Sequence, residues 1–252
     1  MKEKSASPNG FQPERIGAVL FDLDGTLRHS RPSFYQTFID IASRLDAPVT
    51  PQACWHTQRW MHYYWAQSPE LLEDLQTYKD QQEQFWVNHY QLALLEVGCR
   101  PEQAQDLAPT VFLHMAEEFK PSDWVPPDVP YTLEILKDVG VRLAVVTNRT
   151  HPCQELIESL GLGGYFEFSL AAGEIQVWKP DPEIFHHALR RLGEQPGETL
   201  YVGDNYYADV VGARSAGLWP VLLDPDRIFP EAGCPVIQSV GDLPGLLQKQ
   251  DG

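Results

Sequence analysis

The second half of the chain alternates short apolar runs with helical patterns, and this alternation constrains the fold more than any other feature. The apolar runs predict strands over 143–147, 166–171, 199–202 and 220–223. The patterns between them predict helices over 132–138, 152–160, 182–192 and 208–216. An earlier run, residues 16–21, is typical of a buried parallel strand. This alternation predicts an α/β, Rossmann-like core, a parallel sheet with helices on both faces.

Residues 33–120 differ from the rest, because they are rich in Trp, Gln, Glu and Leu with few β-branched clusters. We interpret them as an inserted all-helical cap domain. The α/β core then consists of residues 16–32 and 121–252, and residues 1–15 form a flexible tail. A Pro-rich stretch at 121–130 is interpreted as a linker, since proline blocks helix propagation.

Charge, apolar runs and cysteine spacing each argue against a class of protein. The 19 basic and 35 acidic residues give a net charge of −16, which disfavours a nucleic-acid partner. No apolar run is long enough for a membrane span, and the N-terminal residues lack the apolar stretch of a signal peptide. The four cysteines are scattered without a CxxC pair, which favours reduced thiols in a cytoplasmic protein. The sequence leaves open whether the protein is a monomer or a dimer.

Polar residues follow several of the predicted strands. In open α/β sheets the ligand binds at the carboxyl ends of the strands, so these residues are candidates for a site. They are Asp22 and Asp24, Thr147 and Asn148, Lys179, and Asp204, Asn205 and Asp209. Turn and helix-cap chemistry explains each of these groups when it is taken alone. Two carboxylates two positions apart repel each other, however, and a divalent cation is the usual means of keeping both ionised.

These residues carry a resemblance to a known family. The segment Phe21-Asp22-Leu23-Asp24-Gly25-Thr26-Leu27 resembles the first motif of the haloacid dehalogenase superfamily of hydrolases. Thr147, Lys179 and Gly203-Asp204-Asn205-Tyr-Tyr-Ala-Asp209 follow in the order of its other motifs. The interval between positions 22 and 147 is far longer than those separating 147, 179 and 204. A helical cap in that interval is similar to the caps of phosphoglycolate-phosphatase-like members.

The resemblance implies a Mg²⁺-dependent phosphatase that acts on a small phosphorylated metabolite. Asp22 would be the nucleophile that forms an aspartyl-phosphate, and Asp24 the general acid and base. Thr147 and Lys179 would bind the phosphoryl group. The implied Mg²⁺ ligands are Asp22, the main-chain carbonyl of Asp24, and Asp204.

The resemblance also suggests residues around this centre. Asp209 and Asn205 are predicted to orient the residues that bind the metal and the phosphoryl group. We assign Thr26, Asn148, Arg28 and His29 to substrate binding. Arg28 and His29 depart from the commoner family pattern, an apolar residue followed by an acidic one, so the substrate class stays open.

Three alternatives to the phosphatase remain at this stage. A phosphomutase uses the same core, and a haloacid dehalogenase uses the same nucleophile without a metal. A non-catalytic binding protein on this fold is disfavoured, because it would not need the acidic cluster. In the cap, the aromatic and basic residues from Trp55 to Trp65 could contact a substrate, but helical spacing favours core packing.

Overall fold

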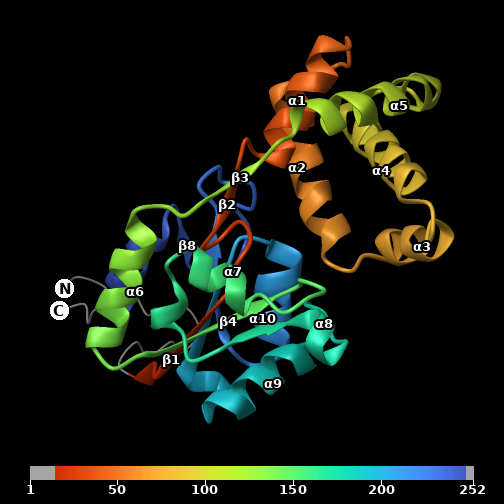
Figure 1. The fold of residues 1–252 in the computed structure, drawn as a ribbon. Coiled ribbons are helices and arrows are strands. Elements are labelled where there is room, and N and C mark those ends of the chain that lie inside the picture. Colours follow the sequence, from red (N-terminus) through yellow and green to blue (C-terminus); the bar gives the residue numbers. More distant parts are fainter. Residues whose placement is uncertain (1–14, 248–252) are drawn as a thin grey trace. The chain divides into compact units, whose positions relative to one another are not determined.

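The computed structural model describes residues 15–247, so the predicted tail lies outside the described residues except for Arg15. The chain forms two compact units (Figure 1), and each is described by itself. Unit 1 contains the described residues up to Arg28 and from Val125 onward, and unit 2 is His29–Trp124. Unit 2 therefore includes short segments on either side of the cap bounds that the sequence suggests, 33–120.

Unit 1 is built on a six-stranded parallel sheet with the strand order β5-β4-β1-β6-β7-β8. The strands are β1 (Ala18–Phe21), β4 (Arg142–Thr147), β5 (Ser169–Ala171), β6 (Thr199–Gly203), β7 (Trp219–Leu223) and β8 (Val236–Ile237). The helices are α6 (Asp128–Asp138), α7 (Gln154–Ser159), α8 (Ala172–Ile175), α9 (Pro182–Leu192), α10 (Gly212–Ser215) and α11 (Leu243–Leu247), with a π-helix η5 (Tyr206–Val211). This architecture confirms the predicted α/β fold.

Both faces of the sheet are covered, because its strands are apolar on both sides. On β1, Val19 and Phe21 pack in one cluster with residues of α6 and α7. Ala18 and Leu20 point the other way and pack with residues of α9 and α10. Figure 1 shows α6 and α9 on opposite sides of the sheet.

The register of the central strands brings their carboxyl ends together. Phe21, the last residue of β1, lies opposite Val145 of β4 and Val202 of β6. Residues that directly follow these positions therefore meet at one edge of the sheet. Asp22 is anchored there, because its backbone N–H donates a hydrogen bond to Val202 O at 2.9 Å.

Several predicted element bounds are wrong. The helix expected over 152–160 begins at Gln154, leaving Pro152 outside it, and the strand expected over 166–171 covers only Ser169–Ala171. The helix expected over 208–216 begins at Tyr206 as a π-helix, because Asn205 Oδ1 accepts hydrogen bonds from Tyr207 N and Ala208 N. The supposed linker 121–130 contains a strand and the start of α6.

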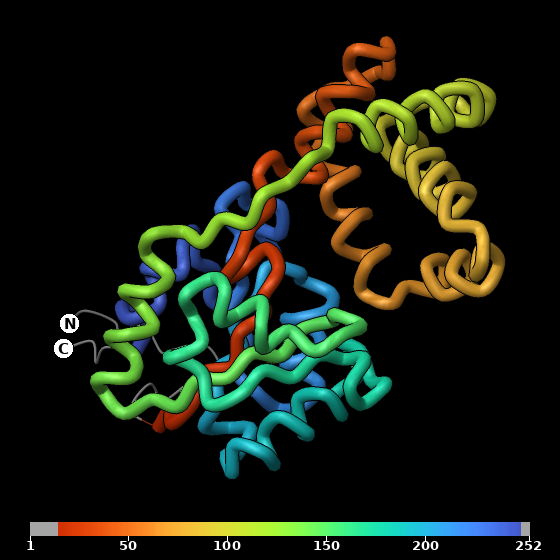
Figure 2. The backbone as a smooth tube through the Cα atoms, in the orientation of Figure 1, coloured from red at the N-terminus to blue at the C-terminus, as the bar shows by residue number. Residues whose placement is uncertain are grey.

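Unit 2 is mostly helical. Its helices are α1 (Phe34–Arg44), α2 (Pro51–Trp65), α3 (Pro69–Thr77), α4 (Gln82–Val97) and α5 (Pro101–Glu118). Ser33, Thr50 and Ser68 each accept a backbone N–H at a helix start, the expected role of a hydroxyl N-cap. Two short strands, β2 (His29–Arg31) and β3 (Ser122–Trp124), pair antiparallel and run side by side in Figure 2. They were not predicted, since three residues carry too little periodicity.

The aromatic residues of unit 2 pack around one buried histidine. His89 on α4 is fully buried, and rings of Trp60, Tyr64 and Trp65 lie 4.8–5.4 Å from its ring. Trp60 and Trp65 belong to the segment of α2 that the sequence marked as a possible substrate contact. Both pack against the helical core of unit 2, so core packing accounts for them.

Candidate active site

The centre of the site is an ion pair between Asp22 and Lys179. Asp22 follows β1, and its side chain is buried. Its Oδ1 accepts a hydrogen bond from Lys179 Nζ at 2.6 Å. Lys179 is itself almost fully buried, so this carboxylate and this ammonium group are held together out of water.

All three donors of the Lys179 ammonium group have partners within hydrogen-bond distance. Besides Asp22, Nζ lies 2.6 Å from Asp209 Oδ1 and 2.8 Å from the hydroxyl oxygen of Tyr201. The Tyr201 hydroxyl in turn donates to Val146 O at 2.8 Å. This network fixes the position of the ammonium group beside Asp22.

Asn148 holds the main chain of Lys179. Its Nδ2 donates to Lys179 O at 2.9 Å, and its Oδ1 accepts from Lys179 N at 2.7 Å. Both ends of the amide are therefore used for positioning. This favours a structural role for Asn148 in place of the substrate contact that the sequence suggests.

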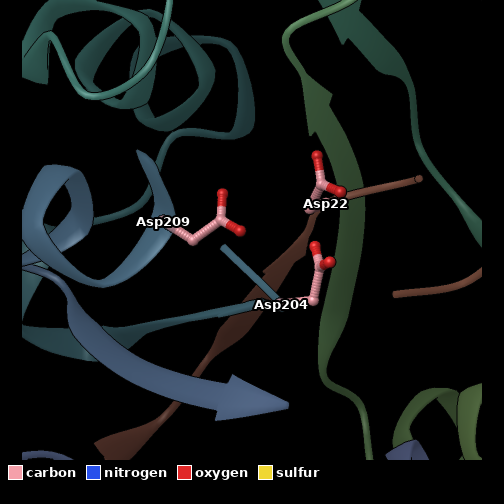
Figure 3. Close-up of side chains that lie close together, drawn as sticks. All are labelled: Asp22, Asp204 and Asp209. Atoms are coloured by element: carbon pink, nitrogen blue, oxygen red, sulfur yellow. The ribbon is translucent and has the colours of Figure 1, made fainter. Parts of the chain in front are cut away.

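Two further carboxylates lie beside this ion pair. Asp22, Asp204 and Asp209 each offer an oxygen, and these oxygens lie within 4.8 Å of one another (Figure 3). Two glycines make room for them. A Cβ on Gly25 would lie 2.2 Å from Asp204 Oδ2, and a Cβ on Gly203 would lie 2.2 Å from Asp209 Oδ2. Both positions therefore exclude larger residues.

The carboxylates of the cluster carry a strong electrostatic cost. Burial raises the pKa of Asp22 to about 7, since the opposing effect of Lys179 is only partial and Asp209 and Asp24 add repulsion. Burial, followed by repulsion from Asp22 and Asp209, raises the pKa of Asp204 well above its usual value. Burial would lower the pKa of Lys179, but Asp209 and Asp22 outweigh it and raise that pKa well above its usual value.

This donor set fits a hard divalent cation. Carboxylate oxygens are the ligands that Mg²⁺ prefers, and a bound cation offsets the repulsion that raises these two carboxyl pKa values. Asp209 has other partners, because its Oδ1 accepts from Lys179 and its Oδ2 accepts from Asn205 N at 2.8 Å. Asp22 and Asp204 are therefore better suited as ligands than Asp209.

Asp24 is held by two arginines. Arg149 forms a two-pronged contact with its carboxylate, from Nε to Oδ2 at 2.7 Å and from Nη2 to Oδ1 at 2.9 Å. Arg28 adds a contact from Nη1 to Oδ1 at 2.6 Å. Burial would raise the pKa of Asp24, but the hydrogen bonds and charges of Arg149 and Arg28 outweigh it and lower that pKa. Asp24 is therefore ionised at neutral pH.

The remaining predicted residues lie in different surroundings. Thr147 is buried at the end of β4, next to Asn148. Thr26 is buried too, and its hydroxyl has no hydrogen-bond partner within residues 15–247. Asn205 caps η5. His29 belongs to unit 2, where its ring packs 5.7 Å from that of Trp124.

Sequence reasoning missed Arg149 and Tyr201. Arg149 could have been found, because it directly follows Thr147 and Asn148 at a strand end, where a cation meets the ligand edge of the sheet. Tyr201 gave no such signal, since a tyrosine inside an apolar strand is usually core. Only the fold shows that its hydroxyl reaches Lys179.

The sequence matches a known family of hydrolases. A family model described as a haloacid dehalogenase-like hydrolase matches residues 16–217. The chain belongs to this family.

Individual members of the family have different activities. The chain is 33% identical to a glyceraldehyde 3-phosphate phosphatase of Methanopyrus kandleri over 82% of this chain and 84% of that one. A solved 2-haloacid dehalogenase of Pseudomonas syringae pv. Tomato is 28% identical, with a TM-score of 0.51 over 92% of this chain and 98% of that one. A predicted phosphoglycolate phosphatase from Haemophilus somnus, 22% identical, has a TM-score of 0.58 over 93% and 99% of the two chains and shows the fold alone.

Among the described residues, no helix combines the length and the apolar character that crossing a bilayer requires.

Proposed function

We propose that the protein is a magnesium-dependent phosphatase that hydrolyses a small phosphorylated metabolite through an aspartyl-phosphate on Asp22. The observation that carries the proposal is the Asp22–Lys179 pair beside the carboxylates of Asp204 and Asp209, in a chain of this hydrolase family. The relative from Methanopyrus kandleri, named as a phosphatase, supports the reaction class.

Asp22 is the proposed nucleophile. The contact with Lys179 Nζ fixes one carboxylate oxygen, which leaves the other to attack phosphorus. Lys179 lowers the repulsion between the attacking carboxylate and the phosphoryl oxygens, and Asp209 and Tyr201 keep its ammonium group in place. Thr147 lies at the same sheet edge and is proposed to donate a hydrogen bond to a phosphoryl oxygen.

Asp24 is the proposed general acid and general base. In the first step the protonated form of Asp24, a minor form at neutral pH because its pKa is lowered, gives its proton to the leaving oxygen. The carboxylate so formed then removes a proton from the water that hydrolyses the aspartyl-phosphate, which returns the proton to Asp24. Arg28 and Arg149 favour its ionised form, which suits the second step directly. In the first step the proton transfer matters most for leaving groups that are strong bases.

The metal site is proposed to consist of Asp22, Asp204 and the main-chain carbonyl of Asp24. When bound, Mg²⁺ supplies positive charge that keeps both carboxylates ionised and offsets the charge of the phosphate. The single positive charge of Lys179 already pairs with two carboxylates, those of Asp22 and Asp209, so it does not also neutralise an incoming phosphate dianion. Asn205 and Asp209 are proposed to orient this centre.

The two alternative activities on this fold, dehalogenase and phosphomutase, are less well supported. A dehalogenase attacks carbon with the same aspartate and needs no cation, whereas this site gathers two further carboxylates, Asp204 and Asp209, beside the nucleophile. A phosphomutase differs in residues that retain the intermediate, and no described residue argues for that.

The cytoplasmic location predicted from the cysteines stays a prediction; Cys54, Cys99, Cys153 and Cys234 are all free thiols in the structure.

Phosphate release from a panel of phosphorylated metabolites and p-nitrophenyl phosphate, measured with Mg²⁺ and with EDTA, tests the proposal. We expect metal-dependent release that Asp22→Asn abolishes. Asp226→Asn, the same chemical change on an exposed loop residue, is the control and should leave the rate unchanged. Release of halide from a 2-haloacid without metal, or isomerisation of a sugar phosphate without release, would replace the proposal by a dehalogenase or a mutase.

A further inference from the structure

Two arginines contact the carboxylate of Asp24, the group proposed to exchange protons with the substrate. Arg149 donates hydrogen bonds to both carboxylate oxygens of Asp24, and Arg28 donates to one of them. The side chains are partly open to solvent, with exposed fractions of 37% for Asp24, 34% for Arg149 and 18% for Arg28. A soluble anion can therefore reach these guanidinium groups without unfolding of unit 1.

The main chains that carry both arginines are fixed. Arg28 closes a tight turn, because its N–H donates to Leu23 O at 2.9 Å and its carbonyl accepts from Gly25 N at 2.8 Å. The carbonyl of Arg149 accepts from Gly173 N at 3.0 Å. A Cβ on Gly173 would lie 1.9 Å from Thr150 O, so this segment packs closely on the glycine. The two guanidinium groups are thus preorganised beside the carboxylate, which favours binding.

The position of Asp24 determines which part of a substrate the two arginines can contact. If Asp24 transfers a proton to the leaving oxygen, its carboxylate lies one hydrogen bond, about 2.7 Å, from that oxygen. The guanidinium nitrogens lie one further hydrogen bond from the carboxylate. Substituents on the leaving group, one or two carbons from the reacting oxygen, therefore fall within reach of Arg28 and Arg149.

A guanidinium group carries five N–H donors in a planar fork, and this geometry matches carboxylates and phosphates alike. Arg149 already demonstrates the bidentate mode on a carboxylate of its own chain. A carboxylate or phosphate of the substrate can share these donors with Asp24 or take its place.

We propose that Arg28 and Arg149 form a second anion-binding site, which selects phosphomonoesters whose leaving group carries a second anionic group, a carboxylate or a phosphate. This inference rests on the proposed function, since it uses the role of Asp24. It deepens that function by naming the substrate class.

Competition with p-nitrophenyl phosphate hydrolysis tests the site, because inhibition constants can be measured whether or not a competitor is turned over. Two matched pairs separate the sources of the second charge. 3-Phosphoglycerate against glycerol 3-phosphate adds a carboxylate, and ethylene glycol bisphosphate against 2-hydroxyethyl phosphate adds a phosphate, in each case two carbons from the reacting oxygen. We expect the second anion to lower the inhibition constant about 10- to 100-fold in at least one pair.

The variants Arg149→Met and Arg28→Met should each reduce this preference about tenfold, and Arg149→Lys should retain part of it, because it keeps the charge without the fork. The preference is a ratio within one variant, so any effect on Asp24 common to both competitors cancels. Arg190→Met removes an exposed arginine of α9 that pairs with Glu183, and should leave the ratio unchanged.

A wild-type enzyme without preference in either pair would overturn the inference. So would a preference that survives in both arginine variants within twofold, since the arginines would then only position Asp24. Failure of the proposed function looks different, because p-nitrophenyl phosphate itself would not be hydrolysed by the wild-type enzyme.

Discussion

Replacing Tyr201 by Phe removes one oxygen atom from the centre of the lysine network. The hydroxyl accepts a hydrogen bond from the charged Lys179 Nζ and donates one to Val146 O, both at 2.8 Å. Tyr201 is fully buried, so water cannot replace the lost oxygen. A hydrogen bond to a charged group contributes about 1.5–3 kcal/mol and a neutral one about 1 kcal/mol, so we expect unit 1 to lose about 2–4 kcal/mol.

Amide hydrogen exchange measures this loss in unit 1 alone. For amides of β1, β4 and β6 that exchange only on unfolding of the unit, a loss of this size speeds exchange about 30- to 700-fold. Lys179 keeps two carboxylate partners, so we expect kcat to fall about tenfold with KM little changed.

Tyr64→Phe is the matched control, because it removes the same atom from another fully buried tyrosine. The Tyr64 hydroxyl donates to Asp74 Oδ2 at 2.8 Å within unit 2, and Asp74 is partly exposed. Exchange in unit 1 and kcat should not change in this variant. If Tyr201→Phe altered exchange in unit 1 by less than threefold, the network would not hold Lys179 as described.

Three further predictions concern protons and leaving groups. The pKa of Asp22 is about 7 against 3.8 in an unfolded chain, so Asp22 makes the metal-free protein less stable as pH rises from about 4 to 7. Mg²⁺ needs the ionised carboxylate, so the rise in melting temperature that Mg²⁺ causes should grow over this pH range and level off above pH 7. A rise in melting temperature that is independent of pH would contradict the proposed metal site. Asp24→Asn should slow turnover of alkyl phosphates by about 10²–10⁴ and of p-nitrophenyl phosphate less, because nitrophenolate leaves without a proton; equal losses in steady-state assays would argue against the acid role. Burial lowers the pKa of His89 to about 3, so on acidification below about 6.5 the unfolded state gains this proton first, and His89 contributes a loss of stability of about 1.4 kcal/mol per pH unit, opposite in sign to the contribution of Asp22. His89→Leu should remove this contribution, measured as the difference between the pH slopes of variant and wild type in urea unfolding. Because neither ring nitrogen has a hydrogen-bond partner within residues 15–247, the variant should also be more stable by about 1–3 kcal/mol at pH 7, and equal slopes in the two proteins would contradict this.

Long periodic elements could be predicted from sequence, and elements defined by tertiary pairing could not. The helix expected over 182–192 has those bounds, since Asp181 caps its start and Gly193 adopts the left-handed conformation at its end. Short strands such as β2 and β8 exist only because a partner strand lies beside them. Their two or three residues carry no period of their own.

The candidate site divides in the same way. The positions of Asp22 and Asp204 follow from residues at strand ends, because parallel strands bring those ends to one edge. Lys179 lies in the loop after α8, so its place beside Asp22 depends on the fold of that loop. Arg149 and Tyr201 depend on where side chains point within that edge. The use of Asn148 depends equally on the fold, since its amide pairs with the main chain of a residue 31 positions away.

The most direct test of the account is the detection of a phosphorylated Asp22. Asp24→Asn should slow the hydrolysis of the intermediate more than its formation from p-nitrophenyl phosphate, so the intermediate should accumulate in this variant. The reaction is quenched with acid within the first turnovers, and the peptides are analysed by mass spectrometry. The account predicts a phosphoryl group on the peptide containing Asp22, dependent on Mg²⁺ and absent from the Asp22→Asn protein. A phosphoryl group on another residue, or turnover of this variant with no phosphorylated peptide at any time point, would contradict it.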